Sequence, residues 1–293
     1  MLQKIKKIIK YVLPKVILEK LLGFYFRNKK YYYDEDFLNY VYSKKKGLID
    51  NKNRVETLVL RGSNADFGFD PSEFPNSYNL GLTSTDLYSS YYIYQSVSKE
   101  LPNLKNVIIY LNPASIGFEL ARTKEKYRLL AYKYFFDVPI KYDFVDAKAE
   151  KKVLLAILKV KNKNKKNSSM NDGYVKRSGC HETYEALERV KTHLRENERV
   201  PDQIYWLKNL VDVLEWEGKN AYLIITPMRS DYIGFMPSGK DIYKKIYDVF
   251  DDRIIMNYYN DADFSDEDMY DTDHLNEKGA QKLTRKIFKR IKK

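Results

Sequence analysis

The chain has 293 residues, of which 44% are hydrophobic and 31% are charged, and its formal net charge is +12. This length and composition exclude an intrinsically disordered chain and allow one large domain or two small ones. Cys180 is the only cysteine, which excludes an intramolecular disulfide and suits a reducing compartment.

The positive charge is concentrated near both ends of the sequence and in the tract "KVKNKNKKN" at 159–167. The sequence has no zinc-finger spacing, RNP-type aromatic motif or glycine-rich RNA loop. We therefore expect no nucleic-acid partner and interpret the charge as a dispersed basic surface. Attraction to an anionic membrane or to phosphorylated substrates stays open.

Residues 1–53 are predicted to form a basic amphipathic extension. Apolar residues recur among lysines at helical spacing: Leu2, Ile5, Ile8, Ile9 and Val12. Charged residues interrupt this stretch well before the roughly 20 apolar residues that a spanning helix needs. Two interpretations stay open, a helix lying in a membrane interface and a helix packed on the domain. We expect a cytoplasmic protein, with peripheral contact to the inner face of the membrane as one possibility.

Apolar stretches and helical patterns alternate from residue 54 to residue 293. Strands are predicted at 55–63, 106–113, 220–227 and 253–258, and helices at 85–101, 203–218, 239–252 and 276–291. Thr83, Ser84 or Thr85 is available as the N-cap of the helix at 85–101. The strands are apolar throughout, as burial on both faces requires, so the alternation predicts a parallel α/β sheet covered by helices on both faces.

Residues 121–200 break this alternation. They contain the lysine and asparagine tract and then a charged helical stretch, "HETYEALERVKTHLREN". We predict a helical insertion or lid between the third and fourth α/β units rather than an independent domain.

Small and polar residues are predicted at the carboxyl ends of the strands, where doubly wound sheets bind ligands. Ser63 follows the first strand, Gly81 follows the segment "YNL", and Asn112 ends the strand at 106–113. An acidic loop after the last strand leads to Asp271 and His274. These residues are therefore expected at one edge of the sheet.

Four stretches resemble the successive blocks of the SGNH/GDSL hydrolase superfamily: "LVLRGSNADFGFDP", "SYNLGLTS", "IIYLNP" and "DTDHLNEKGA". They are similar to the bacterial branch found with surface-polysaccharide and acyl-transfer systems. The resemblance implies a three-layer α/β/α flavodoxin-like fold over 54–293, with Ser63 as nucleophile and Asp271 and His274 completing a triad. It also implies an oxyanion hole formed by the N–H groups of Ser63 and Gly81 and the side chain of Asn112.

The chemistry of these residue types suits those roles. A serine hydroxyl needs a base to remove its proton, and histidine serves near neutral pH. A carboxylate on the other ring nitrogen holds the histidine in one tautomer. Asp271 precedes His274 by three residues, so one turn brings the two side chains together. Asp273 is expected to point away from His274 as a solvated loop charge.

Other polar residues have simpler interpretations. Asn276 is predicted to be the N-cap of the last helix. Thr226 and Arg229 follow the fourth strand and could contact substrate, although a surface position is the simpler expectation for Arg229. Cys180 and His181 are sequence neighbours, which do not face each other on a helix.

Metal binding is not expected. His193 lies in a charged helical stretch and is expected to be exposed. The acidic run at 261–268 lacks the glycine and closing glutamate of an EF-hand loop, which favours a solvated loop. Three histidines and one cysteine argue against a dedicated zinc site.

The expected function is that of a serine-dependent acyl-ester enzyme. The resemblance favours an O-acetyltransferase or O-acetylesterase acting on a carbohydrate in cell-surface (capsular) polysaccharide biosynthesis. No cofactor is expected, and acetyl-CoA could serve as acyl donor. The sequence assigns neither the sugar nor the acyl acceptor. The alternative is a non-catalytic SGNH-like protein that binds glycan or membrane.

Overall fold

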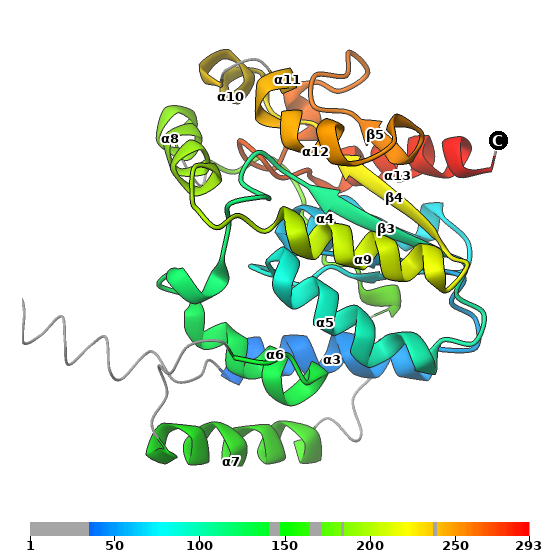
Figure 1. Ribbon diagram of the computed structural model, residues 1–293, viewed down its shortest axis with the longest axis vertical. Coiled ribbons are helices and arrows are strands. Elements are labelled where there is room, and N and C mark those ends of the chain that lie inside the picture. The colour runs from blue at the N-terminus through cyan, green and yellow to red at the C-terminus, as the bar shows by residue number, and fades with distance from the viewer. Residues whose placement is uncertain (1–34, 141–146, 164–170, 183–184, 237–238, 293) are drawn as a thin grey trace, which may run out of the picture.

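The computed structural model describes residues 35–140, 147–163, 171–182, 185–236 and 239–292 (Figure 1). The predicted amphipathic segment at 2–12 and residues 164–167 of the basic tract lie outside these ranges. Within them the chain forms a five-stranded, all-parallel sheet in the order β2-β1-β3-β4-β5. The strands are β1 (Thr57–Leu60), β2 (Ser77–Leu80), β3 (Asn106–Leu111), β4 (Asn220–Ile225) and β5 (Ile255–Asn257).

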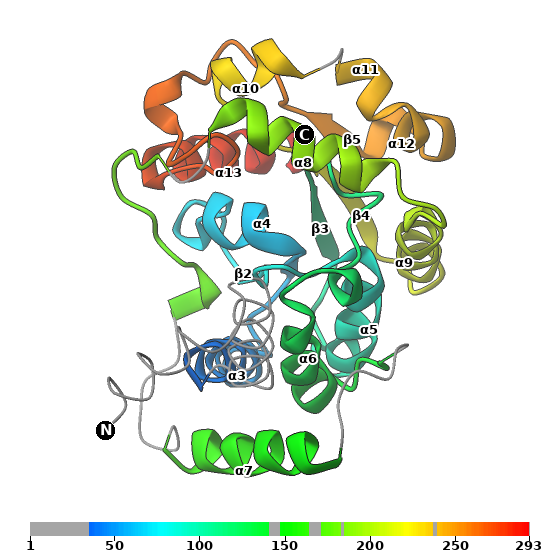
Figure 2. The same cartoon turned by 90° about the vertical axis from the view of Figure 1, so that its left-hand side faces the viewer.

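Helices cover both faces of the sheet, as the strand pattern predicts, and the arrangement is compatible with a three-layer α/β/α fold (Figures 1 and 2). Helices α3, α5 and α9 lie on one face, and α4 and α13 lie on the other. The helices are α3 (Glu35–Asp50), α4 (Gly62–Gly68), α5 (Leu87–Val97), α6 (Leu129–Phe136), α7 (Ala147–Lys163), α8 (Ala186–Asn197), α9 (Ile204–Trp216), α10 (Ser230–Phe235), α11 (Gly239–Ile242), α12 (Lys244–Val249) and α13 (Glu277–Ile291).

Successive strand residues bury their side chains in two separate cores. Leu58 and Ile109 belong to the larger core under α3, α5 and α9. Val59, Ile108 and Ile224 point the other way, into the core under α4 and α13. Burial on both faces explains why these strands are apolar at every position.

The helix boundaries agree in part with the sequence prediction. Asn276 is the N-cap of α13, and its side chain accepts a hydrogen bond from the Gly279 N–H (3.2 Å), which confirms its predicted role. The N-cap of α5 is Asp86, which accepts from the Ser89 N–H (2.8 Å), so the assignment to residues 83–85 is wrong. The predicted helix at 239–252 is two short helices, α11 and α12, separated at Tyr243.

Helix α3 lies within the stretch predicted as an N-terminal extension and contributes to the core. Leu38, Val41 and Leu48 are buried in it. The buried Lys44 ammonium forms an ion pair with Asp66 of α4 (2.5 Å). Because a buried charge needs a partner, this pair fixes α3 against the segment that carries Ser63.

The stretch at 121–200 supplies α6, α7 and α8. Helices α6 and α7 pack against α3, while α8 contacts α10 at the opposite side of the molecule (Figure 2). The outer side of α7 exposes three leucines: Leu154, Leu155 and Leu158. None of the described helices combines the length and apolarity that a membrane crossing requires.

Candidate active site

Ser63 is the second residue of α4, directly after a sharp turn from β1. Arg61 and Gly62 both have positive φ angles, 80° and 61°, so the chain changes from strand to helix within two residues. The buried Arg61 guanidinium donates to the carbonyl groups of Tyr110 (3.1 Å) and Ser115 (3.3 Å), which fixes this strained residue to β3 and the loop after it. The turn presents the Ser63 hydroxyl beyond the carboxyl edge of the sheet.

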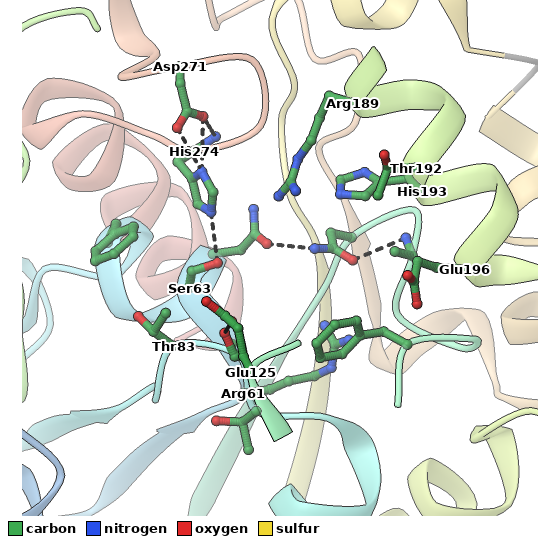
Figure 3. A pocket seen from close by; sticks show the side chains of 18 of the residues that line it. Arg61, Ser63, Thr83, Glu125, Arg189, Thr192, His193, Glu196, Asp271 and His274 are labelled. Atoms are coloured by element: carbon green, nitrogen blue, oxygen red, sulfur yellow. Dashed lines mark hydrogen bonds and ion pairs between the residues drawn. The ribbon is translucent and has the colours of Figure 1, made fainter. Parts of the chain in front are cut away.

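Ser63, His274 and Asp271 form a continuous chain of hydrogen bonds (Figure 3). The Nε2 atom of His274 lies 2.7 Å from the Ser63 hydroxyl. Its Nδ1 atom lies 2.9 and 3.0 Å from the two carboxylate oxygens of Asp271. An ionised carboxylate only accepts hydrogen bonds, so Nδ1 carries the proton and Nε2 is free to accept the serine proton.

The loop that carries Asp271 and His274 is held by its own backbone. The His274 N–H donates to the Asp271 carboxylate (2.9 Å), and the Tyr270 N–H donates to the His274 carbonyl (2.8 Å). An antiparallel bridge between Met269 and Leu275 closes the loop. The three-residue spacing thus forms the compact turn that the sequence predicts.

Asp273 is buried, and the expectation of a solvated charge is wrong. Its carboxylate receives two hydrogen bonds from the Arg189 guanidinium of α8, at 2.9 and 2.6 Å. It also lies 3.8 Å from Nδ1 of His274. Burial opposes its charge, but the attraction of Arg189 and His274 is stronger, so the pKa of Asp273 is held well below its usual range.

Two carboxylates therefore act on His274. Burial lowers the pKa of this imidazole. The negative charge of Asp273 and the hydrogen bond and charge of Asp271 raise the pKa by more than burial lowers it, so the pKa of His274 lies above its ordinary value. Arg189 works weakly in the opposite direction. His274 consequently gains basicity, which favours removal of a proton from Ser63.

The close grouping of Asp271, Asp273 and His274 also satisfies the distances for a shared cation. The same atoms are already hydrogen bonded, because Asp271 accepts from His274 and Asp273 accepts from Arg189. The arrangement is therefore explained by hydrogen bonding among these side chains.

Gly81 does not line the pocket next to Ser63, so its predicted place in an oxyanion hole is wrong. Its N–H donates to the side-chain oxygen of Asn79 (2.9 Å). A Cβ atom at this position would lie 2.5 Å from the backbone nitrogen of Asp66, so close packing against α4 accounts for the glycine. The chain reaches the pocket at 83–85, where Ser84 has a positive φ of 65°.

Asn112 lies in the pocket at the end of β3, as predicted. Its amide oxygen accepts from the Ala114 N–H (3.1 Å) and the Ser115 hydroxyl (3.0 Å), which orients the NH₂ group. One amide hydrogen is donated to Asn64 (2.8 Å), which leaves the second for a ligand. The N–H of Ser63, in the first turn of α4, has no partner within its helix.

The triad opens into a cavity of about 1000 Å³. This volume is at the upper end of the usual range for ligand pockets. Residues of the predicted insertion form the opposite wall: Lys124, Glu125, Arg128, Arg177, His181, Arg189, Thr192, His193 and Glu196. Figure 3 shows Arg189, Thr192, His193 and Glu196 facing the triad from α8. The insertion is therefore part of the site.

His193 is buried, contrary to the expectation of exposure. Its Nδ1 atom lies 2.6 Å from the Tyr232 hydroxyl, and its Nε2 atom lies 3.8 Å from the Asp273 carboxylate. Burial and the positive charge of Arg189 lower the pKa of His193 to about 3, so it stays neutral near pH 7. It is a neutral wall of the pocket, packed behind Asp273.

The remaining candidates lie away from the reacting groups or pack beside them. Cys180 is exposed, and its neighbour His181 stacks on the Tyr270 ring (centroids 5.7 Å apart), so no thiol dyad forms. Thr226 is buried and donates to the Leu111 carbonyl (3.4 Å). Neither its hydroxyl nor the Cys180 thiol lines the pocket.

Arg229 and the acidic loop differ from expectation in part. Arg229 is largely buried and pairs with Glu182 and Asp231, both at 2.7 Å, so the surface assignment is wrong. In the acidic loop most carboxylates are exposed, as predicted, but Asp268 is buried and caps the turn at Ser265.

Among the pocket residues that were not identified from the sequence are Phe67, Arg177 and Arg189. Phe67 packs edge-on against the His274 ring, with centroids 5.5 Å apart. The two arginines belong to the insertion, whose path over the sheet has no local sequence signal. The net charge of +12 left attraction to an anionic membrane or to phosphorylated substrates open, but it pointed to neither arginine.

Comparison with known proteins adds no family assignment. Neither the scan against protein-family models nor the search of curated proteins finds a match. The geometry of the site is therefore the basis for assigning a function.

Proposed function

We propose that the protein is a serine-dependent acyl-ester enzyme of the SGNH type. The hydrogen-bond chain from Ser63 through His274 to Asp271 supports this proposal most directly. In the proposed reaction His274 removes the proton from Ser63, whose oxygen attacks the acyl carbonyl carbon. His274 then gives this proton to the departing alcohol or thiol, and an acyl-serine remains.

The second half of the reaction transfers the acyl group from Ser63 to a hydroxyl acceptor. His274 removes the proton from the acceptor, the acceptor oxygen attacks the acyl carbon, and the serine oxygen leaves and regains a proton. A sugar hydroxyl as acceptor gives an O-acetyltransferase, and water gives an O-acetylesterase. The N–H of Ser63 and the free amide hydrogen of Asn112 are the proposed donors to the oxyanion.

The proposed substrate is an O-acetylated carbohydrate, or a carbohydrate acceptor with acetyl-CoA as donor, in cell-surface polysaccharide assembly. The size of the pocket and its polar wall from the insertion are consistent with a sugar-sized ligand. Acetate release and acetyl transfer, measured with acetyl-CoA and with a chromogenic acetyl ester in the presence and absence of glycan acceptors, distinguish the transferase from the esterase.

Fluorophosphonate labelling tests whether Ser63 is an activated nucleophile. We expect one labelled site in the wild-type protein and none in Ser63→Ala, because an ordinary serine does not react with such electrophiles. Ser72→Ala, which removes an exposed serine, is the matched control and should label like wild type. Equal labelling of wild type and Ser63→Ala would refute the proposal, and no labelling of either would favour a non-catalytic binding protein.

We further infer peripheral contact with an anionic membrane, supported by the outer side of α7. Leu154, Leu155 and Leu158 are 41, 59 and 57% exposed there, next to the exposed Lys151 and Lys159. Apolar side chains flanked by lysines suit the interface of a negatively charged bilayer. Co-sedimentation with vesicles containing anionic lipid should decrease when Leu155 and Leu158 are changed to Glu. Equal binding of this variant and wild type would contradict the inference.

A further inference from the structure

We propose that Arg177 binds a carboxylate or phosphate group on the substrate, so that the site selects negatively charged carbohydrates or donors. This inference rests on the proposed function for its link to catalysis, but the binding itself can be tested separately. It depends on three observations: the position of the guanidinium, the way its backbone is fixed, and its lack of an acidic partner.

The Arg177 guanidinium lies beside the catalytic histidine. Its central carbon is 4.3 Å from the centroid of the Phe67 ring and 5.2 Å from that of Tyr270. Phe67 in turn packs against the His274 ring at 5.5 Å. A single aromatic ring therefore separates the cation from the catalytic base, and all four side chains line the same cavity.

The backbone on both sides of Arg177 is fixed to the domain. The Arg177 carbonyl accepts from the Glu277 N–H at the start of α13 (2.7 Å). The Val175 N–H donates to the Asp66 carbonyl (3.3 Å), and the His181 N–H donates to the Tyr270 carbonyl (2.5 Å). The segment at 175–181 is thus fixed to α4 and to the loop that carries Asp271 and His274. These contacts hold the Arg177 guanidinium in place before any ligand binds.

The other pocket arginines already have partners. Arg128 pairs with Glu125 (2.7 Å), Arg189 pairs with Asp273 (2.6 Å), and Arg61 donates to two carbonyl groups.

Arg177 differs from Arg128 and Arg189 in that it makes no ion pair with any described carboxylate. Its buried Nε atom has no hydrogen-bond partner among the described residues, a property that it shares with Arg61 and Arg128. A guanidinium is always charged near neutral pH and offers a planar set of donors that fits carboxylate and phosphate. Since no described carboxylate pairs with this guanidinium and its Nε atom has no partner among the described residues, an anionic group of the substrate is the partner that the geometry favours.

Binding of a matched set of sugars tests the proposal. We would measure by calorimetry the affinity of the full-length protein for glucose, glucuronate and glucose 1-phosphate, with inorganic phosphate as a fourth probe. We expect at least one sugar anion to bind about 10-fold or more tightly than glucose, as charge-assisted hydrogen bonds typically allow. Glucuronate represents a carboxylate on the sugar, and glucose 1-phosphate represents a phosphate on the substrate or donor.

Three variants assign the effect. Arg177→Gln should remove the preference for the anion, and Arg177→Lys should keep part of it, because a lysine retains the charge without the planar fork. Lys176→Gln is the matched control, since this exposed lysine pairs with Glu277 outside the pocket and its loss should leave the preference intact. Circular dichroism would verify that each variant is folded.

The possible results separate this inference from the proposed function. No preference for either anion in the wild-type protein, or a preference that Arg177→Gln retains, would overturn the inference. Fluorophosphonate labelling of Ser63 in the same samples reports on the nucleophile independently. Arg177-dependent anion binding without Ser63 labelling would refute acyl transfer and leave the binding site standing.

Discussion

Changing Asp273 to Asn tests whether the buried ion pair between Asp273 and Arg189 stabilises the fold and whether Asp273 raises the pKa of His274. The side chain is fully buried and its Arg189 partner is one-fifth exposed. Removing one member of a buried ion pair costs about 3–5 kcal/mol, because the remaining charge is stranded. Water can reach part of Arg189, so we expect the lower end, about 3 kcal/mol. A domain of this size loses roughly 2–4 °C per kcal/mol, which gives a decrease in Tm of about 6–12 °C.

The same substitution should change the pH dependence of activity. The charge of Asp273 contributes to the raised pKa of His274, so its removal lowers that pKa. The base must be neutral to accept a proton, and therefore the acidic limb of the kcat/KM profile should move to lower pH in Asp273→Asn. A purely structural role for Asp273 would lower stability without moving this limb.

Thermal and denaturant unfolding measure the stability part of the prediction. Asp263→Asn is the control, because Asp263 also pairs with a cation, Lys286, but is 71% exposed, and exposed pairs contribute about 0–1 kcal/mol. Arg189→Gln should be destabilising as well, and the double variant should recover part of the loss through their coupling. A Tm for Asp273→Asn within about a degree of the Asp263→Asn value would show that the buried pair contributes no more stability than the exposed one.

Further predictions concern the triad and the packing beneath it. Asp271→Asn should keep the fold but lower kcat by about 10⁴, since the acceptor that fixes the His274 tautomer is lost; steady-state kinetics checks this, and an unchanged kcat would contradict the assignment. In the wild-type protein the acidic limb of kcat/KM should have its midpoint above the usual histidine value of about 6.5, because the pKa of His274 is raised; a midpoint below that value would disagree with the structure. Gly81→Ala should cost about 1–3 kcal/mol in denaturant unfolding, because the added Cβ clashes with α4. Gly68→Ala is its control, since a Cβ there meets neighbours only at ordinary contact distance, and equal stability of the two variants would show that the clash is absent.

The sequence predicted the parallel α/β sheet because both-sided burial makes the strands apolar at every position. It also placed Ser63, Asp271 and His274 together, since parallel strands bring their carboxyl ends to one edge of the sheet. The prediction for Gly81 was wrong because the glycine is required by close packing against α4, where a Cβ atom would clash. A sequence does not distinguish this requirement from one imposed by a ligand site.

The partners of Asp273 could not be predicted in the same way. Asp273 and Arg189 are 84 residues apart, and their pairing depends on where the insertion carries α8. Adjacent residues in a loop usually alternate in direction, which suggested solvent for Asp273. In the folded chain the Asp273 carboxylate instead meets the Arg189 guanidinium of α8.

The bond between Ser63 and His274 joins residues that are 211 positions apart. During synthesis β1 and α4 leave the ribosome long before the loop that carries the histidine. At a typical translation rate of about 5–20 residues per second, synthesis of the residues between Ser63 and His274 takes on the order of ten seconds or more. If Ser63 is the nucleophile, as we propose, a partly made chain holds an unactivated serine, and the proposed reactivity towards acyl donors begins only when the final loop has docked.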